Sequence, residues 1–494
     1  MKKADILPIA LFSIVALILY SSVFYLEYLY TDEASELWSF KDGINFGTSV
    51  PQGRYISYKI FVWIFGFINT SHDVIYARAI SLFGWITCIP IWYFIFEKVI
   101  GDRNKIITLL SMFYMICMPS FTISIVWASC LEIFLAATTG LISGYILYSG
   151  IKYEQGRINI SSKTIIASLF FGIISLFTYQ TGFGCFFLPF ILIYIIEKKF
   201  SRVVNIGLIS GVLIYGIYFL LFKYSIKING LQPSERTLLA FDDPIGRVQF
   251  LLANPMASGF HFTRVFTEDS IAGKIWYYIF LLLWLIFLFI EMKTSTWKNK
   301  IIYLPGLLLF FVLIYFPFMI IVEKYSSNRT LFALDFAVFL MVTHSVFAII
   351  KKEKYKKIIA ATLAIIFIGN AWYNIHNEFL YPISSEFSGI KKIITEKYST
   401  SIDSIYYIRP AENAFEEKYK VTRSWDEFGV PSTAKNWTPE PLLKQLIFEK
   451  TQNRNIAAKL IIKTWPDIEA FKKENVFISK RTLFIDGSKL VSGN

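Results

Sequence analysis

Long apolar runs recur along the whole of this 494-residue chain, and most of them are close to twenty residues in length. A helix of about twenty apolar residues crosses the hydrocarbon core of a bilayer. Charged residues make up only 17% of the chain, below the ~25% that is usual in soluble domains. The sequence therefore predicts a mainly α-helical, polytopic membrane protein with about eleven spans. The runs are 6–26, 74–96, 106–119, 122–150, 164–181, 183–196, 203–222, 275–290, 301–322, 330–350 and 358–373.

Two of these runs, 106–119 and 183–196, are short for a span, which predicts tilted or broken helices. Residues 164–196 are too long for one span and contain Gly182-Phe183-Gly184. Glycines so closely spaced between apolar runs favour a tight turn. We therefore expect this tripeptide to connect two spans at the membrane surface.

The positive charge of the chain, +13 in total, is unevenly distributed. If the amino terminus is cytoplasmic, the cytoplasmic segments hold 19 basic residues against 7 acidic ones, whereas the first outside loop holds 3 against 6. Cytoplasmic loops of membrane proteins carry the excess of Lys and Arg. The charge therefore predicts an N-in/C-out orientation in a bacterial inner (plasma) membrane, with membrane lipids and no nucleic acid as partners.

The polar segments divide the chain into two predicted domains. Residues 1–376 form the transmembrane part, with long periplasmic loops at 27–73 and 223–273. Residues 377–494 form a small periplasmic α/β domain. Its aromatic residues Trp425, Phe428, Trp437 and Trp465 are candidates either for contact with a sugar or for core packing. The tail is predicted to contain helices at 382–398 and 439–452 and strands at 403–409, 458–465 and 476–485.

Two adjacent carboxylates, Asp32 and Glu33, follow the first apolar run directly. At the membrane surface, partial desolvation raises a carboxyl pKa and makes the carboxylate a better general base. An acidic turn that caps a helix would give the same pattern. Asp32 is the first candidate for a catalytic base. Glu33 is the alternative or its orienting partner, and Glu36 is a third candidate acid.

Cationic and polar residues on the predicted outer side form the candidate substrate-binding set. Arginine suits phosphate because its rigid guanidinium donates two parallel hydrogen bonds. Positive groups on a side where orientation does not require them suggest contacts to an anionic ligand or to lipid headgroups. The candidate substrate-binding residues are Arg54, Tyr179, Gln180, His261, Arg264, Lys324 and Arg329.

Three further ionisable residues, Arg78, Glu132 and Asp335, fall within or at the edges of apolar runs. Ionisable residues at such depth are usually functional or paired with one another. The sequence contains no metal-ligand cluster, P-loop or Gly-rich dinucleotide fingerprint, so neither a metal nor another cofactor is expected.

Several short elements, in this order and on this side of the membrane, resemble the GT-C class of polyprenyl-phosphate-sugar-dependent glycosyltransferases. Within that class the chain is most similar to the serotype-converting O-antigen glucosyltransferases, the bactoprenol-linked family. The resembling elements are Asp32-Glu33, Gly53-Arg54, Tyr179-Gln180, Asn328-Arg329 and Asp426-Glu427-Phe428-Gly429.

This resemblance implies an inverting glycosyltransferase with a GT-C-like membrane domain. Its donor would be undecaprenyl-phosphate-sugar, with glucose as the expected sugar, and its acceptor a lipid-linked O-antigen or another surface polysaccharide. It also implies that the enzyme works with a donor synthase and a flippase. Asp32 or Glu33 would deprotonate the acceptor hydroxyl, and Arg54 and Arg329 would neutralise charge on the leaving phosphate.

Three alternatives remain open at the level of the sequence. An O-antigen polymerase or ligase is also multi-spanning, but would not be expected to carry an Asp-Glu loop after the first span together with a terminal α/β domain. A polysaccharide or lipid transporter would distribute polar residues through its spans. A lipid-carrier-dependent mannosyl or aminoarabinose transferase would differ from the predicted O-antigen glucosyltransferase only in its substrate.

Overall fold

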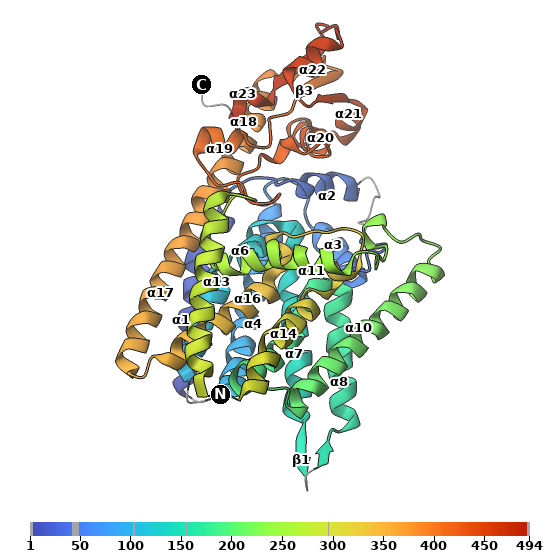
Figure 1. Ribbon diagram of the computed structural model, residues 1–494. Helices are drawn as coiled ribbons and strands as arrows, with labels where there is room; N and C mark the ends of the chain where they lie inside the picture. The colour runs from blue at the N-terminus through green and yellow to red at the C-terminus, as the bar shows by residue number, and fades with distance from the viewer. Residues whose placement is uncertain (1–2, 42–48, 102–103, 155–156, 295, 492–494) are drawn as a thin grey trace.

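The computed structural model describes residues 3–41, 49–101, 104–154, 157–294 and 296–491. A bundle of long helices occupies one end of the molecule, and a small domain that contains the carboxy terminus occupies the other (Figure 1). The elements of the bundle are α1 (Lys3–Tyr20), η1 (Ser21–Phe24), α4 (Val74–Ile100), α5 (Lys105–Cys117), α6 (Pro119–Val126), η3 (Ala128–Cys130), α7 (Ile133–Gly150), α8 (Ser162–Thr178), η4 (Gln180–Phe187), α9 (Leu188–Glu197), α10 (Arg202–Ile228), α13 (Ile271–Glu291), η6 (Met292–Thr294), α14 (Trp297–Ile314), α15 (Phe316–Ile320), α16 (Asn328–Ile349) and α17 (Glu353–Tyr373).

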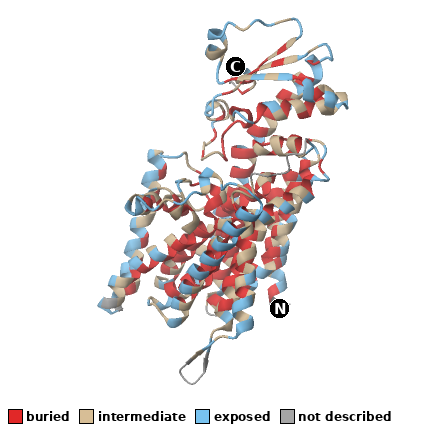
Figure 2. Ribbon diagram, turned by 90° about the vertical axis from the view of Figure 1, so that its right-hand side faces the viewer, coloured by how far each residue is buried: buried red, intermediate tan, exposed pale blue. Residues whose placement is uncertain are grey.

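The bundle is that of a multi-pass membrane protein, as predicted. Within the described ranges, eight helical segments are long and apolar enough to cross a membrane, or nine if α5 and α6 form one span. Only 22% of the α13 segment is buried against other helices, compared with 72% of the α16 segment. Large apolar side chains on the outside of the bundle are therefore left for contact with lipid, while the buried residues gather at its centre (Figure 2).

The number of spans is smaller than the eleven predicted from the apolar runs. Helix α5 and helix α6 are bent by 44° at a break. Pro119 begins α6, and a proline at this position cannot continue the hydrogen bonding of the preceding helix. Helix α8 and the described part of α14 fall short of span length. Apolar runs alone therefore overestimate the spans because some of the apolar helices are short or broken.

The expected surface turn at Gly182-Phe183-Gly184 is wrong. All three residues are buried within the 3₁₀ helix η4. A Cβ added to Gly182 would come within 2.6 Å of the Ala136 side chain, and one added to Gly184 within 2.6 Å of the Ile314 carbonyl oxygen. These glycines allow close packing of backbone segments inside the bundle.

Short elements cross the end of the bundle that faces the carboxy-terminal domain, and α2 and α11 are visible there in Figure 1. The amino terminus and a small antiparallel hairpin lie at the opposite end. The described parts of segment 27–73 and the tail therefore share one end of the bundle. The short elements are α2 (Asp32–Lys41), α3 (Tyr55–Phe65), η5 (Glu235–Thr237), α11 (Pro244–Ala253) and α12 (Pro255–His261), and the hairpin consists of β1 (Lys152–Glu154) and β2 (Arg157–Asn159).

The tail contains a three-stranded parallel sheet in the order β4-β3-β5, flanked by helices, which confirms the predicted α/β character. The predicted strands and helices each correspond to an observed element. The predicted boundary at residue 376 falls inside a π-helical segment that joins α17 to α18. The elements of the tail are η7 (Asn374–Leu380), α18 (Tyr381–Lys397), β3 (Ser404–Ile408), α19 (Ala414–Tyr419), η8 (Ser432–Ala434), α20 (Pro439–Thr451), α21 (Arg454–Lys459), β4 (Ile461–Trp465), α22 (Ile468–Lys473), β5 (Thr482–Asp486) and α23 (Gly487–Val491).

Candidate active site

A cavity of about 940 Å³, which we call the first cavity, lies where the bundle meets α2 and the tail. One part of its wall is charged. Another part is apolar, and α10 contributes residues at three- and four-residue spacings to it, which places them on one face of that helix. The charged residues of the wall are Asp32, Glu36, Arg54, Glu132, Arg236, Glu323, Arg329 and Asp426, and the α10 residues are Val212, Tyr215, Gly216, Tyr218, Phe219 and Phe222.

Asp32 begins α2 and lines the first cavity. Its Oδ1 accepts a hydrogen bond of 2.8 Å from the indole nitrogen of Trp437 in the tail. Burial raises the pKa of the Asp32 carboxyl above its usual range, while the charge of Arg329 and the bond from Trp437 act in the opposite direction. A carboxylate with these surroundings has the properties of a general base.

Glu36 lies one helical turn after Asp32 and also lines the first cavity. Its Oε2 accepts a 2.7 Å hydrogen bond from the Ser129 hydroxyl. Burial raises the pKa of Glu36 well above its usual range, and the negative charge of Asp32 raises it further. The largest contributions to the pKa shift of Glu36 include no cation, whereas the charge of Arg329 lowers the pKa of Asp32. The two carboxyl groups are therefore pushed apart in pKa, with Asp32 as the member that ionises first.

Glu33, the other predicted catalytic residue, is fully buried and does not line the first cavity. One of its oxygens lies 2.6 Å from Arg78 Nη2 and also accepts from the Tyr30 amide, while the second accepts from the Ala128 amide. These contacts fasten the start of α2 to α4 and to the turn before α7. Glu33 is therefore placed to orient Asp32 and to form a structural ion pair. Its buried position does not suit a catalytic base.

Arg54 stands at the amino-terminal end of α3 and places its guanidinium in the first cavity, 4.4 Å from the ring centroid of Tyr179. Gly53 precedes it with φ of +79°, and a Cβ there would come within 2.2 Å of the Tyr218 hydroxyl. Gln180 Nε2 donates to the Gln52 carbonyl oxygen over 2.6 Å. The two predicted pairs, Gly53-Arg54 and Tyr179-Gln180, are therefore adjacent in space.

Among the described residues, Arg54 differs from the other arginines of the first cavity in that no carboxylate lies within ion-pair distance of it. Its buried Nε makes no hydrogen bond, and no ion pair of Arg54 occurs within the residues that the structure describes. Arg236, by contrast, lies 3.8 Å from Glu323. Glu132 interacts electrostatically with Arg54 without an ion pair at contact distance, and the buried Arg54 Nε keeps a free donor, so the guanidinium is suited to receive an anionic group.

Arg329 lies in the first turn of α16 and is held by the tail. Its Nη2 lies 3.1 Å from Asp426 Oδ2 and donates to the Tyr325 hydroxyl, and its Nε lies 3.8 Å from Glu427. The Glu427 carboxylate accepts from the backbone amides of Asn328 and Arg329. The acidic motif of the tail therefore caps α16 and fixes the arginine in the wall of the first cavity.

Three of the predicted substrate-binding residues lie away from the first cavity. Lys324 forms a 3.0 Å ion pair with Asp243 at the surface. His261 and Arg264 lie beside a second cavity, where His261 Nε2 donates a 3.2 Å hydrogen bond to the Gly273 carbonyl oxygen. The exposed Arg264 guanidinium lies over the ring of Phe266, at 5.0 Å.

Residues distant in sequence complete the first cavity. Trp437, half exposed in the tail, was predicted only as an aromatic for sugar contact or core packing, and Arg236, from the segment 223–273, was not among the predicted site residues. Their local sequence gives no signal, because only the folded chain brings them to Asp32. Of the other tail aromatics considered as sugar contacts, Phe428 and Trp465 are buried in the core, and Trp425 lines the second cavity.

Comparisons of this chain with protein-family models, with curated proteins and with solved structures found no match.

Proposed function

We propose that the chain is an inverting glycosyltransferase of the bacterial inner membrane. It moves a sugar, with glucose as the expected one, from a polyprenyl-phosphate carrier to a lipid-linked polysaccharide on the periplasmic side. The observation that carries this proposal is the composition of the first cavity, in which an apolar wall along α10 leads to an unpaired Arg54 and a partly desolvated Asp32. A lipid phosphate and a base are needed together for this chemistry.

The arrangement suits a lipid-linked donor. The apolar face of α10 would receive the polyprenyl chain, and Arg54 would bind the phosphate with its guanidinium stacked on Tyr179. Arg329, although paired with Asp426, lies on the same wall and adds positive charge. Fixed charges directed at a leaving phosphate can contribute a few kcal/mol, roughly 3, to stabilising a transition state in a site that excludes water.

Asp32 would remove the proton from the acceptor hydroxyl. The hydroxyl oxygen then attacks the anomeric carbon from the side opposite the phosphate, the carbon–oxygen bond to the phosphate breaks, and its electron pair leaves with the phosphate. Inversion at the anomeric carbon follows from this single displacement. Burial raises the pKa of Glu36, so Glu36 rather than Asp32 would serve as a hydrogen-bond donor to the sugar in its protonated form.

The decisive experiment uses the purified full chain in lipid nanodiscs with a polyprenyl-phosphate-hexose and a lipid-linked polysaccharide. The proposal predicts that polyprenyl phosphate is released and that each product gains the mass of one hexose with the opposite anomeric configuration. Growth of the polysaccharide by whole repeats would indicate a polymerase instead. Transfer of the whole glycan to another lipid would indicate a ligase, and movement across the bilayer without a new bond would indicate a transporter.

Blocking the apolar wall of the first cavity is expected to weaken donor binding. Gly216 on α10 lines this cavity, and no atom lies within 4 Å of a Cβ added to it. The indole in Gly216→Trp would occupy space proposed for the polyprenyl chain and raise KM for the donor by about tenfold or more. Gly369→Trp on α17 is the matched control, since that glycine also has open space around its Cβ but does not line the cavity. Equal KM values for both variants would contradict the proposed donor path.

The pH dependence of transfer reports on Asp32. The base must be ionised, so activity is lost as the pH falls through its pKa, and a raised pKa places this loss at a higher pH than for an ordinary aspartate. Arg329 lowers this pKa, so Arg329→Gln is expected to move the acid limb of kcat further upward. Trp437→Phe removes one hydrogen bond and is expected to move it in the same direction. An acid limb that stays in place in both variants would exclude Asp32 as the titrating group.

A further inference from the structure

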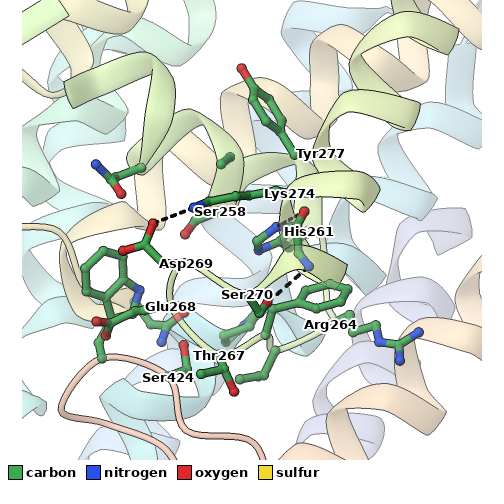
Figure 3. Close-up of a pocket in the computed structure, with 18 of the residues that line it drawn as sticks. Ser258, His261, Arg264, Thr267, Glu268, Asp269, Ser270, Lys274, Tyr277 and Ser424 are labelled. Atoms are coloured by element: carbon green, nitrogen blue, oxygen red, sulfur yellow. Dashed lines mark hydrogen bonds and ion pairs between the residues drawn. The ribbon is translucent and has the colours of Figure 1, made fainter. Parts of the chain in front are cut away.

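The second cavity, of about 320 Å³, lies between α12, the start of α13, α16 and the tail loop that contains Ser424 and Trp425 (Figure 3). Its volume is at the lower end of the roughly 300–1,000 Å³ typical of small-molecule sites. Its rim carries exposed Glu268 and Asp269 together with Lys274, which lies 3.0 Å from Asp269. The cavity is therefore open to polar ligands at the rim.

The inner wall of the second cavity contains two buried polar atoms that make no hydrogen bond of standard geometry to a described residue. Asp335 is 4% exposed, and its Oδ1 makes no hydrogen bond in the described part of the chain, while its Oδ2 accepts a 2.9 Å bond from Ser120. Asn328 is 7% exposed, and its Nδ2 makes no hydrogen bond of standard geometry among the described residues, but the amide lies close enough to Glu427 to donate to that carboxylate, so Asp335 Oδ1 is the less satisfied of the two atoms. Leaving such groups unpaired is costly, and they indicate a ligand that supplies both a donor and an acceptor.

The spacing of these two groups sets the size of the ligand. Asn328 and Asp335 are seven residues apart on α16, so they share one face of the helix and are separated by roughly 10 Å along its axis. The rings of Trp425, Tyr277 and Tyr278 also line the cavity. An amide donor, a carboxylate acceptor and aromatic rings are together suited to a sugar, whose hydroxyls donate and accept and whose ring has apolar faces.

An anionic ligand, which the sequence suggested for His261 and Arg264, fits the second cavity less well. Burial lowers the pKa of His261 to about 4, so the imidazole is neutral at neutral pH. The side chain of Arg264 lies over aromatic rings, and Lys274 is paired with Asp269. The exposed Glu268 on the rim would also repel an anion.

We propose that the second cavity binds one or two neutral sugar residues of the acceptor glycan through Asn328, Asp335 and Trp425. This inference rests on the proposed function and assigns the acceptor a site of its own. Asn328 lines the second cavity, and the next residue, Arg329, lines the first. In the tail loop, Trp425 likewise lines the second cavity and Asp426 lines the first. One wall therefore separates the two cavities, and the bound sugar lies next to the proposed donor site.

The test is saturation-transfer NMR on the full chain in nanodiscs with four methyl glycosides, of glucose, galactose, mannose and rhamnose. At least one is expected to bind, and Asp335→Asn should weaken that binding by about tenfold or more, since it replaces the unpaired acceptor with a donor. The asparagine retains an oxygen for Ser120, so the melting temperature should stay unchanged or rise. Trp425→Ala, in a surface loop, is a second variant expected to weaken binding.

Two comparisons distinguish this site from the proposed reaction. Asp32→Asn should retain sugar binding, because Asp32 lines only the first cavity, and Asp243→Asn is the matched control for an exposed carboxylate. Binding that survives both Asp335→Asn and Trp425→Ala, or that is lost in Asp32→Asn, would overturn the assignment. Absence of binding for all four glycosides, with hexose transfer intact, would overturn this inference and leave the proposed function standing. Sugar binding without hexose transfer would overturn the proposed function and leave the second cavity as a sugar-binding site.

Discussion

Asp32→Asn is expected to lower kcat for sugar transfer by about 10²–10⁴ while leaving the melting temperature unchanged. Asparagine is nearly the same size as aspartate and keeps an oxygen that can accept the hydrogen bond from Trp437. What it loses is the ability to take a proton from the acceptor hydroxyl. Single-turnover measurements with saturating donor would separate this loss from any change in donor binding.

Glu36→Gln and Asp243→Asn are the controls for this prediction. Because the surroundings of Glu36 favour its protonated form, glutamine mimics its state and should change kcat little. Asp243 lies in an exposed pair with Lys324, outside both cavities, and its replacement should leave transfer unaffected. If Glu36→Gln were inactive and Asp32→Asn active, the roles of the two carboxyl groups would be reversed.

The sequence predicted best those features that depend on local pattern. All three strands of the tail were predicted, although the predicted strand 476–485 begins six residues before β5 (Thr482–Asp486). Arg54, Tyr179 and Arg329 were selected from short motifs on one predicted side of the membrane, and the structure brings all three to one cavity. The prediction succeeded because these residues were assigned to one side of the membrane, and residues at one end of a bundle lie close together even when they are far apart in sequence.

Features that depend on which partner a residue meets were beyond the sequence. Asp32 and Glu33 are adjacent, yet one faces the first cavity and the other faces Arg78, since consecutive residues of a helix point in different directions. Gly182 had the pattern of a surface turn but packs against Ala136. The short 106–119 run, by contrast, did predict a tilted or broken helix, and the 44° bend between α5 and α6 confirms it.

Breaking the ion pair between Glu33 and Arg78 is expected to destabilise the fold by about 3–5 kcal/mol. Both side chains are fully buried, and the guanidinium also donates to the Tyr28 carbonyl oxygen and lies 3.5 Å from the Tyr28 ring centroid. In Arg78→Met the Glu33 carboxylate would lose its cation but remain in a dry environment. The free energy of unfolding, measured by denaturation in mixed micelles, should therefore fall far more than for a surface pair.

Lys391→Met provides the matched comparison, because Lys391 lies 2.6 Å from Glu27 in a half-exposed pair that also joins the bundle to the tail. Its loss should cost no more than about 1 kcal/mol, since water already screens such a pair. The double variant Glu33→Gln with Arg78→Met removes both buried charges and should recover part of the stability lost in Arg78→Met. Equal losses in Arg78→Met and Lys391→Met would show that the buried pair does not anchor α2. The position of Asp32 would then depend on its contacts with the tail.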